Sequence, residues 1–142
     1  MRVRFWCYAF FFCSLLALIG CGGKTGPSVK GKVLLDGQPV AGAKVTFEGK
    51  GGNVAITDSE GKFFLDGKAF TSVQPGKYVV SVTKYLNKEG KAPPSEDFDQ
   101  LLAANQLTNS LPAQYGGPEE NPLTAEIKDG VNELPPFELK SK

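Results

Sequence analysis

The sequence predicts an all-β fold, a β-sandwich of about seven strands with one short helix in a long loop. From residue 29 onward, apolar and polar residues alternate in short runs. Glycine, aspartate and proline separate these runs at short, regular intervals, as turns do between strands. The 142-residue chain is also long enough for one domain with a single core.

The N-terminal half of this domain is expected to hold four strands. Each is a short alternating run that ends at a turn signal, and the side chains of Val45, Phe47, Phe63 and Leu65 are expected to face the core. The four strands are expected at residues 29–35, 43–47, 53–57 and 62–65.

Two turns between these strands have specific signals. Asp36-Gly37 predicts a tight turn because both positions must tolerate a positive φ, and residues 38–42 are expected to continue as a loop. At residues 58–61, the Asp58 carboxylate can accept bonds from nearby backbone N–H groups, and Gly61 can adopt the left-handed conformation. Half of a calcium loop is the alternative, but the Asp-x-Asp-x-Asp-Gly run and the distal Glu are missing. We therefore interpret this segment as a turn.

The strongest strand signal follows a Gln-Pro-Gly turn. Tyr78, Val80 and Val82 are expected to face the core, while the residues between them face the other way. Two closing strands are expected at residues 123–127 and 137–139.

Three motifs along residues 28–84 occur together in one known family. They are Val-x-Gly-x-Val-x-x-Asp-Gly-x-Pro-Val-x-Gly-Ala-x-Val at 29–45, Thr57-Asp58-x-x-Gly61-x-Phe63, and Pro75-Gly76-x-Tyr78-x-Val80-x-Val82. In this order they resemble the carboxypeptidase regulatory-like domain, which is a transthyretin-like (prealbumin-like) β-sandwich. In metallocarboxypeptidases this domain is an appendage without catalytic residues, so the resemblance implies no active site.

Residues 86–122 are too long for a hairpin loop, and loops of this length are often functional. Within them, Ser95 is expected to cap a short amphipathic helix over residues 96–104. The aromatic residues Tyr85, Phe98 and Tyr115 form a candidate recognition surface, because aromatic side chains with polar tips are favoured in binding patches. For Tyr115 the alternative is a cap on the sandwich edge.

The acidic residues of the predicted helix have a structural explanation. Glu96 and Asp97 would lie in its first turn, where the helix dipole favours negative charge. A cation site or an acid–base pair that also uses Asp99 is the alternative.

The N-terminus carries an export signal. Two arginines are followed by an apolar run over residues 5–19 and then by small residues, which is the order of a secretory signal. The sequence Leu18-Ile19-Gly20-Cys21 resembles the lipobox of bacterial lipoproteins at all four positions. The resemblance implies cleavage between Gly20 and Cys21, with diacylglycerol on the Cys21 thiol and an acylated new N-terminus. An uncleaved transmembrane helix, an ordinary signal peptide cut nearby and a buried N-terminal helix are the alternatives.

This organisation divides the chain into a signal peptide (1–20), a flexible tether (21–28) and the β-sandwich domain (29–142). The protein is expected to lie in the cell envelope, attached to a membrane through its lipid. Because Gly22 rather than aspartate follows the cysteine, the sorting rule known for some lipoproteins favours the outer membrane.

Composition excludes several function classes. There is no histidine, which removes His-based triads and the usual zinc sites, and there is no G-x-S-x-G elbow. The formal net charge of +1 leaves no basic surplus for nucleic acid. We therefore expect no enzyme and no cofactor besides the covalent lipid. The expected function is a protein-binding or structural envelope module; a carbohydrate-binding domain and an accessory subunit of an envelope peptidase or transport complex are the alternatives.

Overall fold

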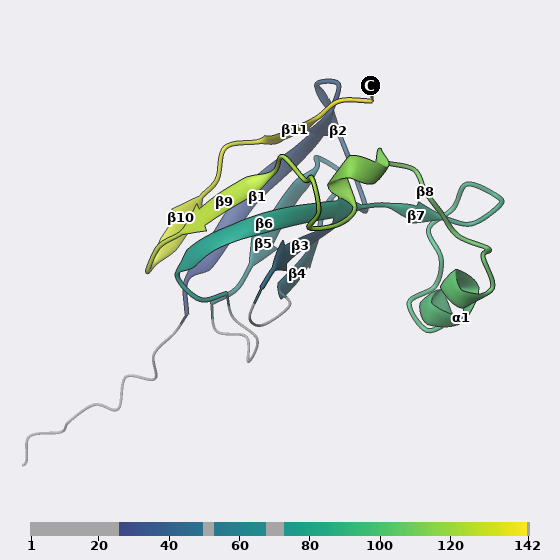
Figure 1. Ribbon diagram of the computed structural model, residues 1–142, viewed down its shortest axis with the longest axis horizontal. Helices are drawn as coiled ribbons and strands as arrows, with labels where there is room; N and C mark the ends of the chain where they lie inside the picture. The colour runs from purple at the N-terminus through teal and green to yellow at the C-terminus, as the bar shows by residue number, and fades with distance from the viewer. Residues whose placement is uncertain (1–25, 50–52, 68–72, 142) are drawn as a thin grey trace, which may run out of the picture.

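One face of the fold is a four-stranded antiparallel sheet, drawn in Figure 1. The computed structural model describes residues 26–49, 53–67 and 73–141. Along the sheet the strands are β4 (Asn53–Ile56), β3 (Lys44–Glu48), β6 (Gly76–Thr83) and β9 (Thr124–Ile127). Val45 lies opposite Val82, and Phe47 lies opposite Val80, so the alternating residues of β3 and β6 share one apolar face.

The other face is a sheet built around β1 (Ser28–Leu35). It pairs antiparallel with β5 (Lys62–Leu65) and β2 (Gln38–Pro39), and parallel with β10 (Val131–Glu133) and β11 (Phe137–Leu139). The fold is therefore an all-β sandwich, as predicted.

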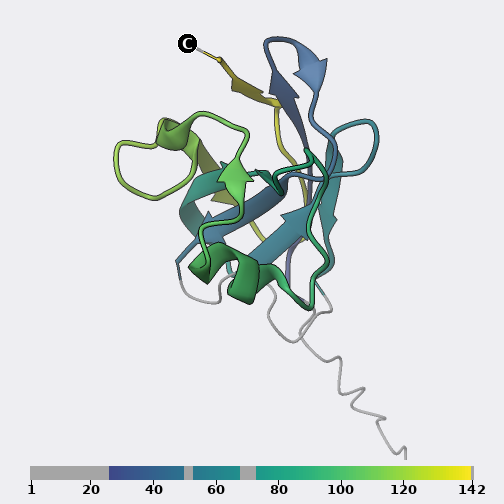
Figure 2. The ribbon, with the colours of Figure 1, turned by 90° about the vertical axis from the view of Figure 1, so that its right-hand side faces the viewer.

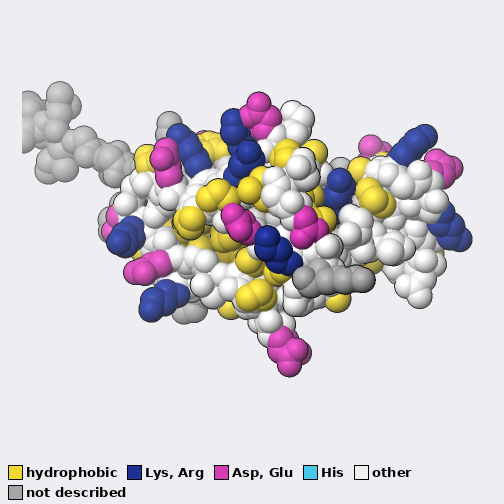
Figure 3. Space-filling model, turned by 90° about the horizontal axis from the view of Figure 1, so that it is seen from above, with side chains coloured by type: hydrophobic (Ala, Val, Ile, Leu, Met, Phe, Trp, Pro, Cys, Tyr) yellow, Lys and Arg dark blue, Asp and Glu magenta, His cyan; other side chains and the backbone are white. Residues whose placement is uncertain are grey.

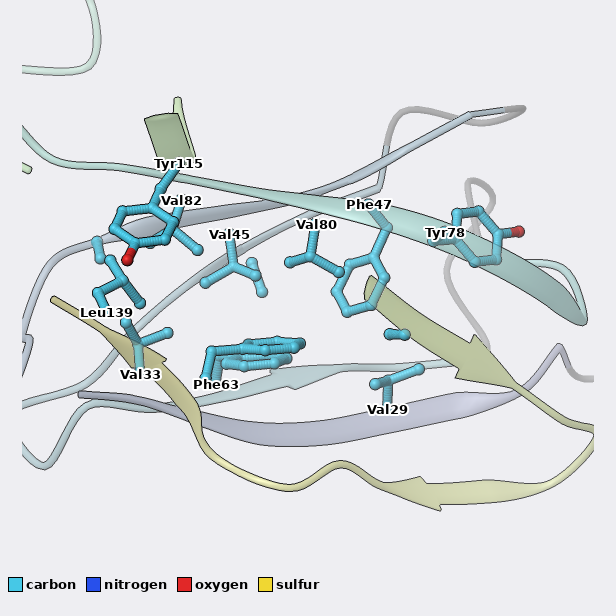
Figure 4. Close-up of a cluster of buried hydrophobic side chains, with 14 of the residues drawn as sticks. Val29, Val33, Val45, Phe47, Phe63, Tyr78, Val80, Val82, Tyr115 and Leu139 are labelled. Atoms are coloured by element: carbon cyan, nitrogen blue, oxygen red, sulfur yellow. The ribbon is translucent and has the colours of Figure 1, made fainter. Parts of the chain in front are cut away.

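The core lies between the two sheets, and side chains from both point toward one another in Figure 4. Phe47 and Phe63 come from opposite sheets, and their ring centroids are 6.2 Å apart. Phe63 also stacks on Phe137 of β11 at 6.0 Å. Its ring lies over Gly31 of β1, where a Cβ atom would be only 2.4 Å away, so this strand position requires glycine.

The four predicted strands of the N-terminal half are confirmed to within a residue or two as β1, β3, β4 and β5. Val45, Phe47 and Phe63 are buried as expected, whereas Leu65 is only half-buried and packs against the margin of the core. The strongest strand is confirmed as β6, with Tyr78, Val80 and Val82 buried.

Both predicted turns are confirmed. Asp36 and Gly37 have φ values of 49° and 82°. The Asp58 carboxylate accepts bonds from the backbone N–H groups of Glu60 and Lys62 at 2.8 and 2.9 Å, and Gly61 has a φ of 73°. The hydrogen bonds of the turn therefore occupy the Asp58 oxygen that the calcium-loop alternative would need as a ligand.

The loop expected over residues 38–42 is partly wrong, because it begins with the strand β2. The tight turn returns the chain directly along β1, so Gln38 lies opposite Leu35, and Pro39 lies opposite Leu34. Strand β10 was not predicted, since its three residues lack an alternating pattern and Val131 is 69% exposed.

The predicted helix is shorter than expected and starts later. Helix α1 spans Phe98–Ala103, its N-cap is Asp97 rather than Ser95, and no side chain caps it. A turn precedes the helix, because the Asp97 N–H donates to the Pro94 carbonyl at 3.3 Å. None of the helical residues is buried, so the expected amphipathic face does not pack into the core.

Candidate functional site

Residues 84–123 form an excursion between β6 and β9, which faces the viewer in Figure 2 and extends from the right of the sandwich in Figure 1. It contains α1 and two short paired strands, β7 (Tyr85–Leu86) and β8 (Thr108–Asn109). At its base, the Asn109 Oδ1 accepts a bond from the Lys84 N–H at 3.0 Å, and the Ser110 hydroxyl donates to the Lys84 carbonyl at 3.0 Å. These bonds close the base of the excursion beside the end of β6.

A cleft of about 410 Å³ opens between the excursion and the four-stranded sheet. The excursion contributes Tyr85 and Phe98, and the sheet contributes Lys44, Ile56 and Thr83. The Tyr85 and Phe98 rings meet edge to face, with centroids 5.5 Å apart and an interplanar angle of 82°. Two of the three predicted aromatic residues therefore share one site.

Lys44 connects the sheet to the helix across this cleft. Its ammonium nitrogen lies 5.9 Å from the centre of the Phe98 ring, which is within the range of a cation–π contact. Ser95 and Asp99 lie on the helical side of the same cleft. The cleft thus combines an apolar aromatic wall with one cation from the sheet and one carboxylate from the helix.

Tyr115 does not belong to this site. It ends the short 3-10 helix η1 (Ala113–Tyr115), is 4% exposed and joins the hydrophobic core. Its hydroxyl accepts a hydrogen bond from the Lys140 N–H at 3.0 Å, which ties η1 to the segment after β11. This position matches the interpretation of Tyr115 as a cap on the sandwich.

Sequence reasoning did not identify Lys44 and Ile56 as cleft residues. Ile56 carried a misleading signal: in residues 53–57, Val54 and Ile56 alternate with small or polar residues as core side chains do, whereas the structure buries Asn53 and Ala55 and leaves Val54 and Ile56 exposed. Lys44 carried none, since only the fold brings it beside Phe98.

Acidic side chains near the helix form no metal-binding group. Within residues 26–49, 53–67 and 73–141, no three His, Cys, Asp or Glu side chains are grouped to hold a metal ion. The expectation that Glu96 and Asp97 lie in the first turn of the helix is wrong, because Glu96 precedes α1 and Asp97 is its N-cap, whereas Asp99 lies in the first turn.

Charged side chains of both signs are interspersed around hydrophobic ones on the face seen in Figure 3. Two exposed groups have shifted pKa values. Hydrogen bonds from Ser141 lower the pKa of Asp36, and the hydrogen bond to the Glu60 carboxylate raises the pKa of Lys62. Both groups lie on the surface, outside the cleft.

The predicted lipid-attachment residue Cys21 and cleavage residue Gly20 lie outside the described residues. Among the helices that the structure does describe, none has the length and apolar character needed to cross a bilayer.

No known protein family matches this chain, and no curated protein does. Among solved structures, the chain is similar to the crystal structure of a DUF3823 family protein from Parabacteroides merdae ATCC 43184. The sequence identity is 16% and the TM-score is 0.34. The match covers 81% of this chain and 46% of that one, so this chain spans about half the length of that protein. We therefore interpret the site from its own geometry.

Proposed function

We propose that this protein is a lipid-anchored, exported, non-catalytic module that binds a partner protein in the cell envelope. The cleft between the excursion and the four-stranded sheet carries the proposal. It is open and predominantly apolar, and two aromatic side chains form its wall, as is typical of recognition sites. The absence of histidine from the whole sequence supports a binding role over catalysis.

The start of β1, to which the proposed tether leads, lies at the opposite end of the sandwich from the cleft. The tether residues 22–27 span at most about 20 Å, so a lipid on Cys21 would hold the membrane close to the start of β1. The Ser28 N–H donates to the Gly130 carbonyl at 3.0 Å, and Gly76 lies opposite Ile127 at the same end. The eight residues of β6 then extend about 25 Å to the base of the excursion. The cleft would therefore point away from the membrane.

The shape of the aromatic pair favours a protein partner over a glycan. Sugar rings stack on flat, exposed aromatic faces, but Tyr85 and Phe98 meet edge to face at 82° and so offer no continuous platform. The exposed side chain of Ile56, 61% accessible, adds an aliphatic contact beside them. An accessory subunit of a larger envelope complex is one form that such a binding module takes.

Site-specific photocrosslinking in intact cells tests this proposal. A photoreactive phenylalanine analogue replaces Phe98 in the cleft, and the control replaces Val131, which is 69% exposed on β10. We expect one discrete, protease-sensitive adduct from position 98 and none from position 131. Equal labelling at both positions, or none at position 98, would contradict the proposal. A glycan-containing, protease-resistant adduct would establish the carbohydrate alternative instead.

A further inference from the structure

We infer that residues 85–109, here called the arm, close onto the solvent face of the four-stranded sheet and cover the cleft when no partner is bound. The inference rests on the proposed binding function and deepens it, since it names how that site is regulated. Three features of the described residues support it: a narrow attachment of the arm, exposed apolar side chains on both sides of the cleft, and opposite charges on its two walls.

The arm is attached to the sandwich through a narrow base. Strands β7 and β8 form its stem, which Lys84 and Ser110 connect to the rest of the chain. The Lys84 carbonyl accepts bonds from the backbone N–H of Ser110 at 2.8 Å and from its hydroxyl at 3.0 Å. Helix α1, to the right of the sandwich in Figure 1, buries no residue, and no described strand packs extensively against it. Residues at the ends of elements commonly serve as hinges, so Lys84 and Ser110 are the positions about which the arm would turn.

Exposed apolar side chains lie on both sides of the cleft. On the sheet, Ile56 lines the cleft and is 61% exposed, and Val54 projects from the same face of β4 and is 41% exposed. On the arm, Leu102 is 40% exposed and lies one turn after Phe98 on the same side of α1. These are three of the five large hydrophobic side chains exposed in the described part of the chain. Each side of the cleft is therefore an apolar surface that the other can cover.

The spacing of these side chains fits a helix laid along β4. Neighbours on one face of a strand are about 6–7 Å apart, and helical residues four positions apart are separated by about 6 Å along the axis. Phe98 already lines the cleft together with Ile56, and its ring lies 5.9 Å from the Lys44 ammonium. Closure would keep Phe98 at Ile56 and bring Leu102 over Val54, which extends an existing contact by one helical turn.

The charges of the cleft favour the same movement. Lys44 lies on the sheet wall and Asp99 on the helical wall, and neither forms an ion pair with a described residue. Closure would bring these two charges together, and their attraction would fix the orientation of the arm on the sheet. The arm also belongs to the same chain, so its effective concentration at the sheet far exceeds that of a second copy. The arm itself is therefore the occupant that we assign to this face.

Closure would regulate the proposed binding site. The closed arm would bury Phe98 and Ile56, which are the side chains that a partner protein would contact in the open cleft. A partner would then bind only the molecules whose arm is open, and its apparent affinity would fall with the open fraction. The contact between the arm and the sheet is thus autoinhibitory.

Disulfide trapping on the full chain in intact cells tests the closure. Val54→Cys and Leu102→Cys are introduced together, and cysteine keeps a small apolar side chain at each position. Because a disulfide needs Cα atoms within about 7 Å, its formation reports that α1 lies against β4. The control pairs Leu102→Cys with Val131→Cys, which is 69% exposed and lies beside the start of β1. After diamide is added, we expect the Val54 pair to form an intramolecular disulfide at least about tenfold faster than the control pair.

Two further comparisons connect closure with binding. With the photoreactive analogue at position 98, oxidation of the Val54 pair should lower crosslinking to the partner at least about tenfold, and reduction should restore it. Leu102→Glu places a charge on the covering side of α1 and should raise crosslinking at least about twofold, because more molecules are open. Gln100→Glu changes an exposed residue on the opposite side of the helix and should leave crosslinking unchanged.

Four results would overturn the inference. They are equal oxidation rates for the two cysteine pairs, unchanged crosslinking after oxidation of the Val54 pair, lower crosslinking in Leu102→Glu, and a disulfide that joins two chains, which would identify a second copy as the occupant. If position 98 is crosslinked to a partner while both pairs oxidise equally slowly, the proposed function stands and only the closure falls. If the Val54 pair oxidises rapidly but position 98 captures no protein in any form, the closure stands and the proposed function falls.

Discussion

Thr57 holds the end of β4 to the start of β3, and its removal gives a quantitative test of the structure. Its hydroxyl donates to the Val40 carbonyl at 2.6 Å and accepts from the Ala43 N–H at 2.8 Å, and Thr57 itself is 4% exposed. Thr57→Val keeps the shape but leaves both backbone groups buried without this partner. Each costs about 1–3 kcal/mol, so we expect a loss of about 3 kcal/mol or more in the free energy of unfolding.

Thermal unfolding followed by circular dichroism measures this loss. At about 4 °C per kcal/mol for a domain of this size, Thr57→Val should lower the melting temperature by about 12 °C. Thr57→Ser keeps both hydrogen bonds and loses one methyl group, at about 1 kcal/mol or about 4 °C. If Thr57→Val were no less stable than Thr57→Ser, the two bonds would not stabilise the fold and this reasoning would be refuted.

Three further predictions use other features of the domain. Gly61→Ala should destabilise the fold far more than Gly37→Ala in the same thermal assay: both positions have positive φ, but a Cβ on Gly61 would lie 2.6 Å from a backbone oxygen, whereas Gly37 faces open space. Gly37→Ala should cost only about 1–2 kcal/mol, and equal costs would contradict the close contact. In an NMR titration the carboxyl of Asp36 should ionise below the usual pH, and Ser141→Ala should raise its pKa, since Ser141 lowers it. The lowered pKa of Asp36 stabilises the fold at pH values above its unfolded-state pKa, and this stabilisation is lost as the pH falls through its folded-state pKa. Asp36→Asn should therefore reduce the fall in melting temperature at acidic pH. An unchanged dependence of the melting temperature on pH would contradict this. Phe98→Ala should leave the melting temperature within about 3 °C, because α1 buries no residue in the core, while abolishing co-purification of the partner protein that the photoreactive residue captures.

The strands could be predicted wherever local pattern and tertiary environment agree. In β6, strict alternation places Tyr78, Val80 and Val82 in the core, and one face of the strand is indeed buried by the opposite sheet. Strand β10 has no such pattern, because its three residues pair with β1 through the backbone while Val131 stays in solvent. Pairing through backbone groups alone leaves no mark in residue type.

The candidate site likewise combines residues that the local sequence could predict with residues that only the tertiary structure brings together. Tyr85 and Phe98 could be singled out because aromatic residues are unusual in a long connection, and this signal can be seen in the local sequence. Lys44 and Ile56 become site residues only through the register of β3 and β4, which places Lys44 opposite Ile56. Ser95 resembled a helix cap, but the turn from Pro94 to Asp97 delays the helix, which a local cap rule does not anticipate.

Intact-mass spectrometry of the protein isolated from membranes tests the central claim, a lipid-anchored binding module, most directly. We predict a mass that begins at Cys21 and includes a diacylglyceryl group and an N-linked acyl chain. The same chain without lipid, or an unmodified chain that still begins at Met1, would contradict the anchor.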